Sequence, residues 1–290
     1  MRLGQAELHR IIDIDPFPIA MDFLIPDAVI GEMQVHADLL APDHVDFQAG
    51  TVLLGLQSYV LKAGGLTVLI DACVGEHKER PLRPDWHRRS DTGYLAALAQ
   101  AGLRPEDIDV VLCTHLHADH VGWNTKLENG RWVPTFPRAR YLIGAAELAH
   151  WQEEERLAPG RHNHGAYADS VLPVEEAGLV EAVEGGFSLG PGLRIVPLPG
   201  HSPGQIGLDL DCGADGHALF CGDAFHSPVQ VYRPHWSSRF CADPVEAARM
   251  RVELLERSEG DGVMLIPAHI RNATGLRARR RDGGFHPVMF

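Results

Sequence analysis

Four potential metal ligands are crowded into residues 113–120, which read CTHLHADH: His115, His117, Asp119 and His120. A single histidine carries little weight in a chain with 17 histidines among 290 residues, since most such side chains are ordinary core or surface groups. Buried together without a metal, however, the imidazoles would repel one another when charged, and the aspartate would need dedicated partners. In an extended segment, positions 115, 117 and 119 point to one side. The spacing therefore favours a metal site over isolated structural histidines.

The cluster directly follows an apolar run, Ile108 to Cys113, that reads as a short buried strand. Upstream, TVLLGLQSYVLKAGG and LTVLIDACVG predict two strands joined by a turn at Gly64 and Gly65. A helix is expected over residues 92–101, with Ser90 or Asp91 as its cap. Downstream, RARYLIGAAELAHWQEEE reads as a strand followed by a helix.

The second half of the chain has the same organisation. LRIVPLPGH, QIGLDLDCG, HALFCGDAF and VMLIPAH are strand candidates, and Asp243-Pro244 suits the start of a helix through about Arg257. Strand clusters followed by helices, occurring twice, predict an α/β fold of two packed sheets with helices outside them. His201, Asp223 and His269 each follow one of these strands, as His115 does. We therefore expect them to meet at one edge of the sheets.

The composition narrows the function classes. A formal net charge of −13 leans away from a nucleic-acid partner, and we interpret the basic run Arg277–Arg281 as a solvated tail. No run of eighteen apolar residues exists, so no membrane span is expected. The N-terminus has no apolar signal-peptide core, and five scattered cysteines without a CxxC pair suit reduced thiols. A cytoplasmic location follows from this as a prediction.

No linker or low-complexity tract divides the chain, so we expect one domain over residues 1–290. Residues 1–45 form an N-terminal segment whose apolar part, PFPIAMDFLIPDAVI, contains three prolines. We expect this segment to cover the mouth of the site or to pack against a second subunit in a homodimer. The aromatic residues Phe23, Trp123, Tyr232 and Trp236 are interpreted as core or interface groups before pocket-lining ones.

The stretch HLHADH matches the HxHxDH motif of the metallo-β-lactamase superfamily, and the rest of that pattern occurs in the same order. PGHSPGQ supplies His201, LFCGDAF supplies Asp223, LIPAH supplies His269, and LIDACVG resembles the family's strand-and-turn segment with Asp71. The resemblance covers roughly residues 50–270. It implies an αββα sandwich, with two mixed sheets and helices on their outer faces.

The resemblance also implies two divalent metal ions at one edge of the sandwich. His115, His117 and His201 would hold the first ion; Asp119, His120 and His269 would hold the second; Asp223 would bridge both. Zinc is the default, although such ligands also accept iron, manganese or cobalt. For Asp71, two interpretations stay open: it fixes the tautomer of a ligating histidine, or it caps a turn.

A dinuclear site of this kind favours hydrolysis. Metal binding lowers the pKa of water to about 7, so that a bridging hydroxide can attack a lactone or ester carbonyl of a small neutral substrate. Asp119 would then pass a proton to the leaving group. The redox flavodiiron branch resembles this pattern but places a glutamate where His117 stands, which argues against redox chemistry here.

Two further stretches, HADHVGWNTKLENGRWVPTFPRARYLIG and GDAFHSPVQVYRPHW, resemble the branch of N-acyl-homoserine lactonases and methyl-parathion-hydrolase-like enzymes. Lactonases of that group often carry a tyrosine three residues after the bridging aspartate, where this chain has His226. His226 either donates a hydrogen bond to the substrate oxygen or is structural. Asp119, Asp223 and His226 are the catalytic candidates. Two alternatives stay open: a phosphotriester or phosphodiester hydrolase with the same metals, and a binding protein that keeps the fold without catalysis.

Overall fold

The strands of the computed structural model, which describes residues 1–290, form two large sheets and one hairpin. The first sheet contains β1 (Arg2–Leu3), β2 (Ala6–Ala20), β3 (Val45–Asp46), β4 (Thr51–Ala63), β5 (Leu66–Ile70), β6 (Val110–Cys113), β9 (Arg140–Gly144) and β10 (Val180–Val183). Its order is β1-β2-β4-β5-β6-β9-β10, with β3 also paired to β4. β5, β6, β9 and β10 run parallel to one another, and the other pairings are antiparallel, so the sheet is mixed.

The second sheet follows chain order. It contains β11 (Ser188–Gly190), β12 (Leu193–Pro197), β13 (Ile206–Asp211), β14 (His217–Gly222), β15 (Met264–Pro267), β16 (Leu276–Arg281) and β17 (Gly284–Met289). Only β14 and β15 pair in parallel, with α9 (Pro244–Gly260) lying between them in sequence. The separate hairpin consists of β7 (Thr125–Glu128) and β8 (Arg131–Pro134).

Apolar side chains at nearly every position give the central strands two buried faces. In β6, Val110 and Leu112 belong to a core cluster shared with Leu208 and Phe220 of the second sheet, so this cluster lies between the sheets. Val111 and Cys113 belong instead to a cluster with α4 (Tyr94–Gln100) and α6 (Ala145–Leu157). Because a strand turns successive side chains to opposite faces, two-sided burial needs an apolar residue at nearly every position.

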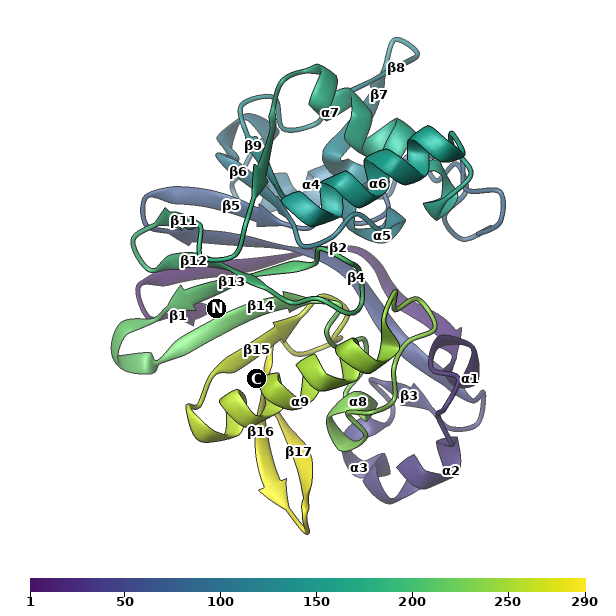
Figure 1. Ribbon diagram of the computed structural model, residues 1–290, viewed down its shortest axis with the longest axis vertical. Helices are drawn as coiled ribbons and strands as arrows, with labels where there is room; N and C mark the ends of the chain where they lie inside the picture. Colours follow the sequence, from purple (N-terminus) through teal and green to yellow (C-terminus); the bar gives the residue numbers. More distant parts are fainter.

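The second sheet is covered in the same way on its outer face. Leu219 and Leu265 of β14 and β15 pack with Met250 and Leu254 of α9. Figure 1 shows α4 and α6 on one side of the stacked sheets and α9 on the other. The predicted αββα sandwich with helices on both outer faces is therefore confirmed. No helix combines the length and the apolar character needed to cross a membrane.

Short helices complete the chain. They are α1 (Met21–Leu24), α2 (Ile30–Met33), α3 (Ala37–Leu40), α5 (Ala118–Val121), α7 (Leu172–Glu176) and α8 (Val229–Tyr232). α9 begins as predicted, because the Asp243 carboxylate accepts hydrogen bonds from the amides of Val245 and Glu246.

Two local predictions are wrong, and one strand was missed. The helix near residue 92 begins after Gly93, without a side-chain cap, so neither Ser90 nor Asp91 caps it. The basic run Arg277–Arg281 lies within strand β16, where it pairs with β17, and is not a tail. The N-terminal residues form the long strand β2, which pairs with β4 along most of its length.

Candidate metal centre

The histidine-rich cluster lies where β6 ends and the chain turns into a helix. His115 and His117 follow the strand in a segment that bends at His115 and is extended at His117, with φ −64° and ψ 154°. Asp119 and His120 lie in the short helix α5. The two histidines lie close together, as predicted, but Asp119 is not part of an extended segment and reaches the same site from the first turn of the helix.

The remaining candidate ligands come from loops at the ends of second-sheet strands. His201 lies in the loop after β12, Asp223 directly follows β14, and His269 comes two residues after β15. Gly200 has a φ of +122°, and a Cβ there would lie 2.4 Å from the backbone nitrogen of Ala247. Only glycine permits this close approach of the His201 loop to the start of α9.

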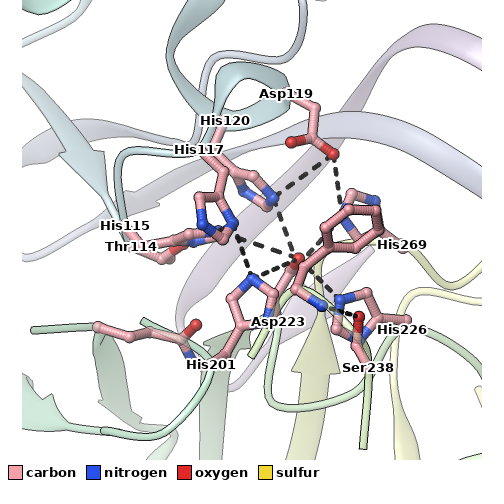
Figure 2. A network of polar contacts seen from close by, with 12 residues as sticks. Thr114, His115, His117, Asp119, His120, His201, Asp223, His226, Ser238 and His269 are labelled. Atoms are coloured by element: carbon pink, nitrogen blue, oxygen red, sulfur yellow. Dashed lines mark hydrogen bonds and ion pairs between the residues drawn. The ribbon is translucent and has the colours of Figure 1, made fainter. Parts of the chain in front are cut away.

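One oxygen of Asp223 faces a first set of histidines, and Figure 2 shows Asp223 at the centre of the cluster. Asp223 Oδ2 is 3.3 Å from His201 Nε2 and 4.0 Å from His115 Nε2. His117 Nδ1 completes this set, 3.0 Å from His115 Nε2 and 2.9 Å from His201 Nε2. These are the three residues expected to hold the first ion.

The other oxygen of Asp223 faces a second set. Asp223 Oδ1 is 3.0 Å from His269 Nε2 and 3.4 Å from His120 Nε2. Asp119 Oδ2 lies 3.7 Å from His269 Nε2 and 4.0 Å from His120 Nε2. The fold thus brings all seven side chains together, with Asp223 between the two sets. That each one binds a metal stays a prediction.

Several buried polar atoms in this cluster make no hydrogen bond. They are His120 Nε2, Asp223 Oδ1 and both ring nitrogens of His226. A buried polar atom without a partner is unfavourable and calls for an explanation. The nitrogen and oxygen atoms in groups of three lie within 4.8 Å of one another, which is the arrangement a metal ion requires. The donor set therefore fits two divalent ions.

The pKa shifts of the clustered side chains also favour metal binding. Burial, together with the neighbouring histidines, holds the pKa of His115 well below its ordinary value, so its imidazole stays neutral near neutral pH. Burial acts to raise the pKa of Asp223, but His269 and His120 outweigh it and hold the pKa well below its ordinary value. A neutral imidazole and an ionised carboxylate are the forms that bind metal.

His120 behaves differently. Burial acts to lower its pKa, but the carboxylates of Asp223, Asp71 and Asp119 outweigh this and raise the pKa well above its ordinary value. In the metal-free protein, His120 therefore holds a proton that metal binding would release.

Asp71 contacts both ends of the histidine-rich segment, at Thr114 and at His120. Its Oδ2 accepts a hydrogen bond from His120 Nδ1 at 2.9 Å, and its Oδ1 accepts one from the Thr114 amide at 2.8 Å. Thr114 Oγ1 in turn lies 3.2 Å from His115 Nδ1. The sequence left open whether Asp71 fixes the tautomer of a ligating histidine or caps a turn. The structure shows the contact with His120, a candidate ligand. This contact directs Nδ1 of His120 to Asp71 and leaves Nε2 to face the site.

His226 lies beside Asp223 at the same edge. Its Nε2 is 3.2 Å from Asp223 Oδ2 without making a hydrogen bond, and its backbone amide donates to Gln230 Oε1 at 2.7 Å. The side chain is buried but lines the same cavity as Asp119 and His269. A substrate-facing role for His226 therefore stays a prediction, and both ring nitrogens are free to serve it.

A cavity of about 310 Å³ opens above the candidate metal centre. Phe17, Ile19 and Leu24 of the N-terminal segment line it, so this segment contributes a wall. A homodimer stays a prediction. Phe23, Trp123, Tyr232 and Trp236 are not among the lining residues; Trp86, Trp151 and Phe240 are, and the sequence reasoning missed these.

Glu147 of α6 is a further residue that the sequence reasoning missed. Its Oε1 accepts hydrogen bonds from the Leu116 amide at 3.0 Å and from Trp151 Nε1 at 2.8 Å, and its Oε2 accepts one from the Gly204 amide at 3.0 Å. Leu116 lies between the first two candidate ligands, and Gly204 lies in the His201 loop. One fully buried carboxylate therefore joins the two segments that carry the first set.

Asn163 supports the same segment from the other side. Its Oδ1 accepts a hydrogen bond from the Ala118 amide at 2.9 Å, and its Nδ2 donates to the Leu116 carbonyl at 2.6 Å. The only sequence signal for either residue is indirect: Gly204 leaves no room for a Cβ, which would lie 2.0 Å from the Glu147 backbone nitrogen.

Glu147→Gln is expected to lower metal affinity about 10- to 100-fold, the effect typical of groups that orient metal ligands. The amide oxygen of glutamine can replace Oε1, but its NH₂ group would face the Gly204 N–H, and two donors cannot bond to each other. The link to the His201 loop is lost while the link to Leu116 stays. Metal titration followed by elemental analysis measures the change.

Glu153→Gln is the matched control, because Glu153 lies on an exposed face of the same helix and pairs only with Arg156. Exposed pairs of this kind contribute little, so metal affinity should not change. If Glu147→Gln bound metal as tightly as Glu153→Gln, the positioning role of Glu147 would be ruled out.

A model of the metallo-beta-lactamase superfamily matches residues 53–269. The matched stretch covers well over half of the chain and contains all seven candidate ligands. The chain belongs to the metallo-beta-lactamase superfamily. The resemblance drawn from the sequence motifs is thereby confirmed.

Among curated proteins, the chain is similar to an N-acyl homoserine lactonase of Bacillus cereus. The two are 28% identical over 133 residues, which is 46% of this chain and 45% of that protein. The matches to the first curated relatives span less than half of each relative's length.

Two solved structures match the fold over the whole chain. AidC, a dizinc quorum-quenching lactonase in complex with a product, has a TM-score of 0.80 at 17% identity, over 100% of this chain and 96% of that one. The hydrolase AbOPH has a TM-score of 0.79 at 20% identity, over 100% and 97%. At such identities the likeness establishes the fold alone.

Proposed function

We propose that the protein is a dinuclear metal-dependent hydrolase that opens a lactone or ester bond of a small molecule. The observation that carries the proposal is the position of Asp223, whose two oxygens face two complete sets of candidate ligands. The first set is His115, His117 and His201; the second is Asp119, His120 and His269. Bound there, two divalent ions, zinc by default, would supply a water of pKa about 7 and polarise the scissile carbonyl.

The chain's own residues account for the remaining needs of the reaction. The cavity above the metal centre is large enough for a small molecule, and eight of its seventeen lining residues are hydrophobic. Trp86 and Trp151 exclude water from the organic part of the substrate. His226 is placed to donate a hydrogen bond from a ring nitrogen to the substrate oxygen.

Asp119 is the proposed proton carrier. It lines the cavity, and it is more exposed than Asp223. Its carboxylate can therefore reach a leaving-group oxygen that enters from the open side, whereas Asp223 is enclosed by histidines. We assign Asp119 to accepting the proton that the attacking water releases and delivering it to that oxygen, and Asp223 to holding the two sets of ligands together.

Lactonases among the curated relatives, and AidC among the solved structures, support the choice of a lactone or ester over a phosphoester. A substrate panel tests this choice. γ- and δ-lactones and p-nitrophenyl esters should be hydrolysed with a kcat/KM about 100-fold or more above that for bis(p-nitrophenyl) phosphate and paraoxon, a difference of about 2.7 kcal/mol in transition-state stabilisation.

A His115→Ala preparation made in parallel controls for a contaminating esterase, because it should lose the activity. A strong phosphoester rate without lactone or ester turnover would replace the proposal with the phosphotriester or phosphodiester hydrolase. No turnover of any member of the panel by the metal-loaded protein would favour a non-catalytic binding protein.

A further inference from the structure

The cavity above the metal centre has a single arginine or lysine in its wall, which is Arg83. Its guanidinium carbon lies 5.2 Å from the centre of the Trp86 ring and 5.7 Å from the centres of the Phe23 and Phe240 rings. Trp86 and Phe240 line the same cavity. Arg83 is therefore a half-buried cation, held between aromatic rings on a wall that also borders the metal centre.

The other arginines on the same loop all have carboxylate partners. Arg80 makes a bidentate pair with Asp169 at 2.7 and 2.8 Å, and Arg89 bonds to Asp13 at 2.9 Å. Arg88 pairs with Glu79. The Arg83 side chain has neither an ion pair within 4.0 Å nor a hydrogen bond, although the chain carries 39 acidic residues.

An arginine in this setting suits an anionic ligand. The guanidinium forms bidentate hydrogen bonds with carboxylates, and these are among the stronger polar contacts in proteins. The aromatic rings hold the side chain in place, so little conformational freedom is lost when a ligand binds. Their apolar surface also lowers the local dielectric, which strengthens an ion pair formed there.

We propose that the substrate carries a carboxylate remote from the bond that is cleaved, and that Arg83 binds this carboxylate. The inference rests on the proposed function and changes the expectation of a neutral substrate that the sequence suggested. Arg83 is thus a specificity-determining residue: one end of the substrate lies at the metal centre and the other beside Arg83, where Trp86 and Phe240 line the cavity.

Matched ester pairs test the proposal with the metal-loaded protein. The mono-p-nitrophenyl esters of adipate, pimelate and suberate are compared with p-nitrophenyl esters of the fatty acids of the same chain length. At least one carboxylate ester should be preferred by about tenfold or more in kcat/KM, mainly through a lower KM, and added salt should reduce the preference.

Arg83→Met should remove the preference, with a loss at least about tenfold larger on the carboxylate ester than on the neutral one, and Arg83→Lys should restore part of it. Arg239→Met is the matched control. Arg239 also lies over the Phe23 ring, at 4.0 Å, but it is exposed and does not line the cavity, so its loss should leave the preference intact.

A binding measurement separates this inference from the proposed function. Calorimetric titration of the metal-loaded protein should show adipate binding more tightly than hexanoate in the wild type and equally tightly in Arg83→Met. This readout needs no turnover. Equal binding of adipate and hexanoate by the wild type, or a preference unchanged in Arg83→Met, overturns the inference, whereas absent turnover with an intact adipate preference overturns only the hydrolase proposal.

Discussion

Asp223→Ala is expected to lower kcat/KM about 10³-fold or more and to leave the protein with fewer than about two bound ions per chain. The reason is geometric: Asp223 Oδ2 lies 3.3 Å from His201 Nε2, and Oδ1 lies 3.0 Å from His269 Nε2. Alanine removes the one carboxylate that faces both sets of ligands. It also removes the negative charge of that carboxylate, which together with the charge of Asp119 would balance the two ions. Steady-state kinetics and elemental analysis of the same preparation measure both effects.

Asp215→Ala provides the matched control, since Asp215 is an exposed aspartate in the turn that precedes β14. It should keep wild-type kinetics and metal content. Circular dichroism shows whether Asp223→Ala still folds, because a buried carboxylate has been removed. A folded Asp223→Ala protein with wild-type turnover would contradict the assignment of the site.

Removal of the metal is expected to abolish turnover reversibly. Dialysis against dipicolinate should reduce the rate about 10³-fold or more, since only the metal supplies a nucleophilic water near neutral pH. Zn²⁺ added back should restore the activity; Mn²⁺ or Co²⁺ should restore it to different extents, because His and Asp ligands accept several divalent ions.

Stability should follow the metal content in the same experiment. An ion at about 1,000 times its dissociation constant stabilises the native state by about 4 kcal/mol, so the chelated protein should unfold at a lower temperature than the metal-loaded one. A protein treated with the same buffer without dipicolinate is the control. Wild-type turnover by a preparation that elemental analysis finds free of metal would exclude a metal-dependent mechanism.

The candidate ligands could be named from the sequence because the pattern is local. His115, His117 and His120 lie within six positions, and His201, Asp223 and His269 each follow a strand that could be recognised from its apolar residues. His201, Asp223 and His269 meet because β12, β14 and β15 run in the same direction, so that their carboxyl ends lie at one edge of the second sheet. The structure adds how Asp223 divides its two oxygens between the sets.

The supporting residues could not be named, because their contacts join distant segments. Glu147 bonds to amides 31 and 57 positions away, and its surroundings, AAELAHWQEEE, read as an ordinary exposed helix. Asn163 lies in a turn with a positive φ of 48°, which identifies a turn but no partner. Arg83 is one of many arginines, and several of them lack a carboxylate partner; only its place in the cavity wall, which the sequence does not reveal, distinguishes it.

The N-terminal strand was missed for a different reason. Pro16 and Pro18 interrupt β2, and proline in an apolar run argues against a central strand. β2 accommodates them through irregular pairing with β4, where the register shifts between Ile12 and Ile14 and again between Ile14 and Phe17. Such irregularities depend on the partner strand, so periodicity in one segment could not reveal them.

Anomalous diffraction from crystals of the active protein tests the central claim most directly. Data collected above and below the absorption edge of the metal found by elemental analysis should show two peaks at the edge of the sandwich. One should lie among His115, His117 and His201 and the other among Asp119, His120 and His269, with Asp223 between them. No peak among these side chains in crystals that turn over substrate would contradict the account.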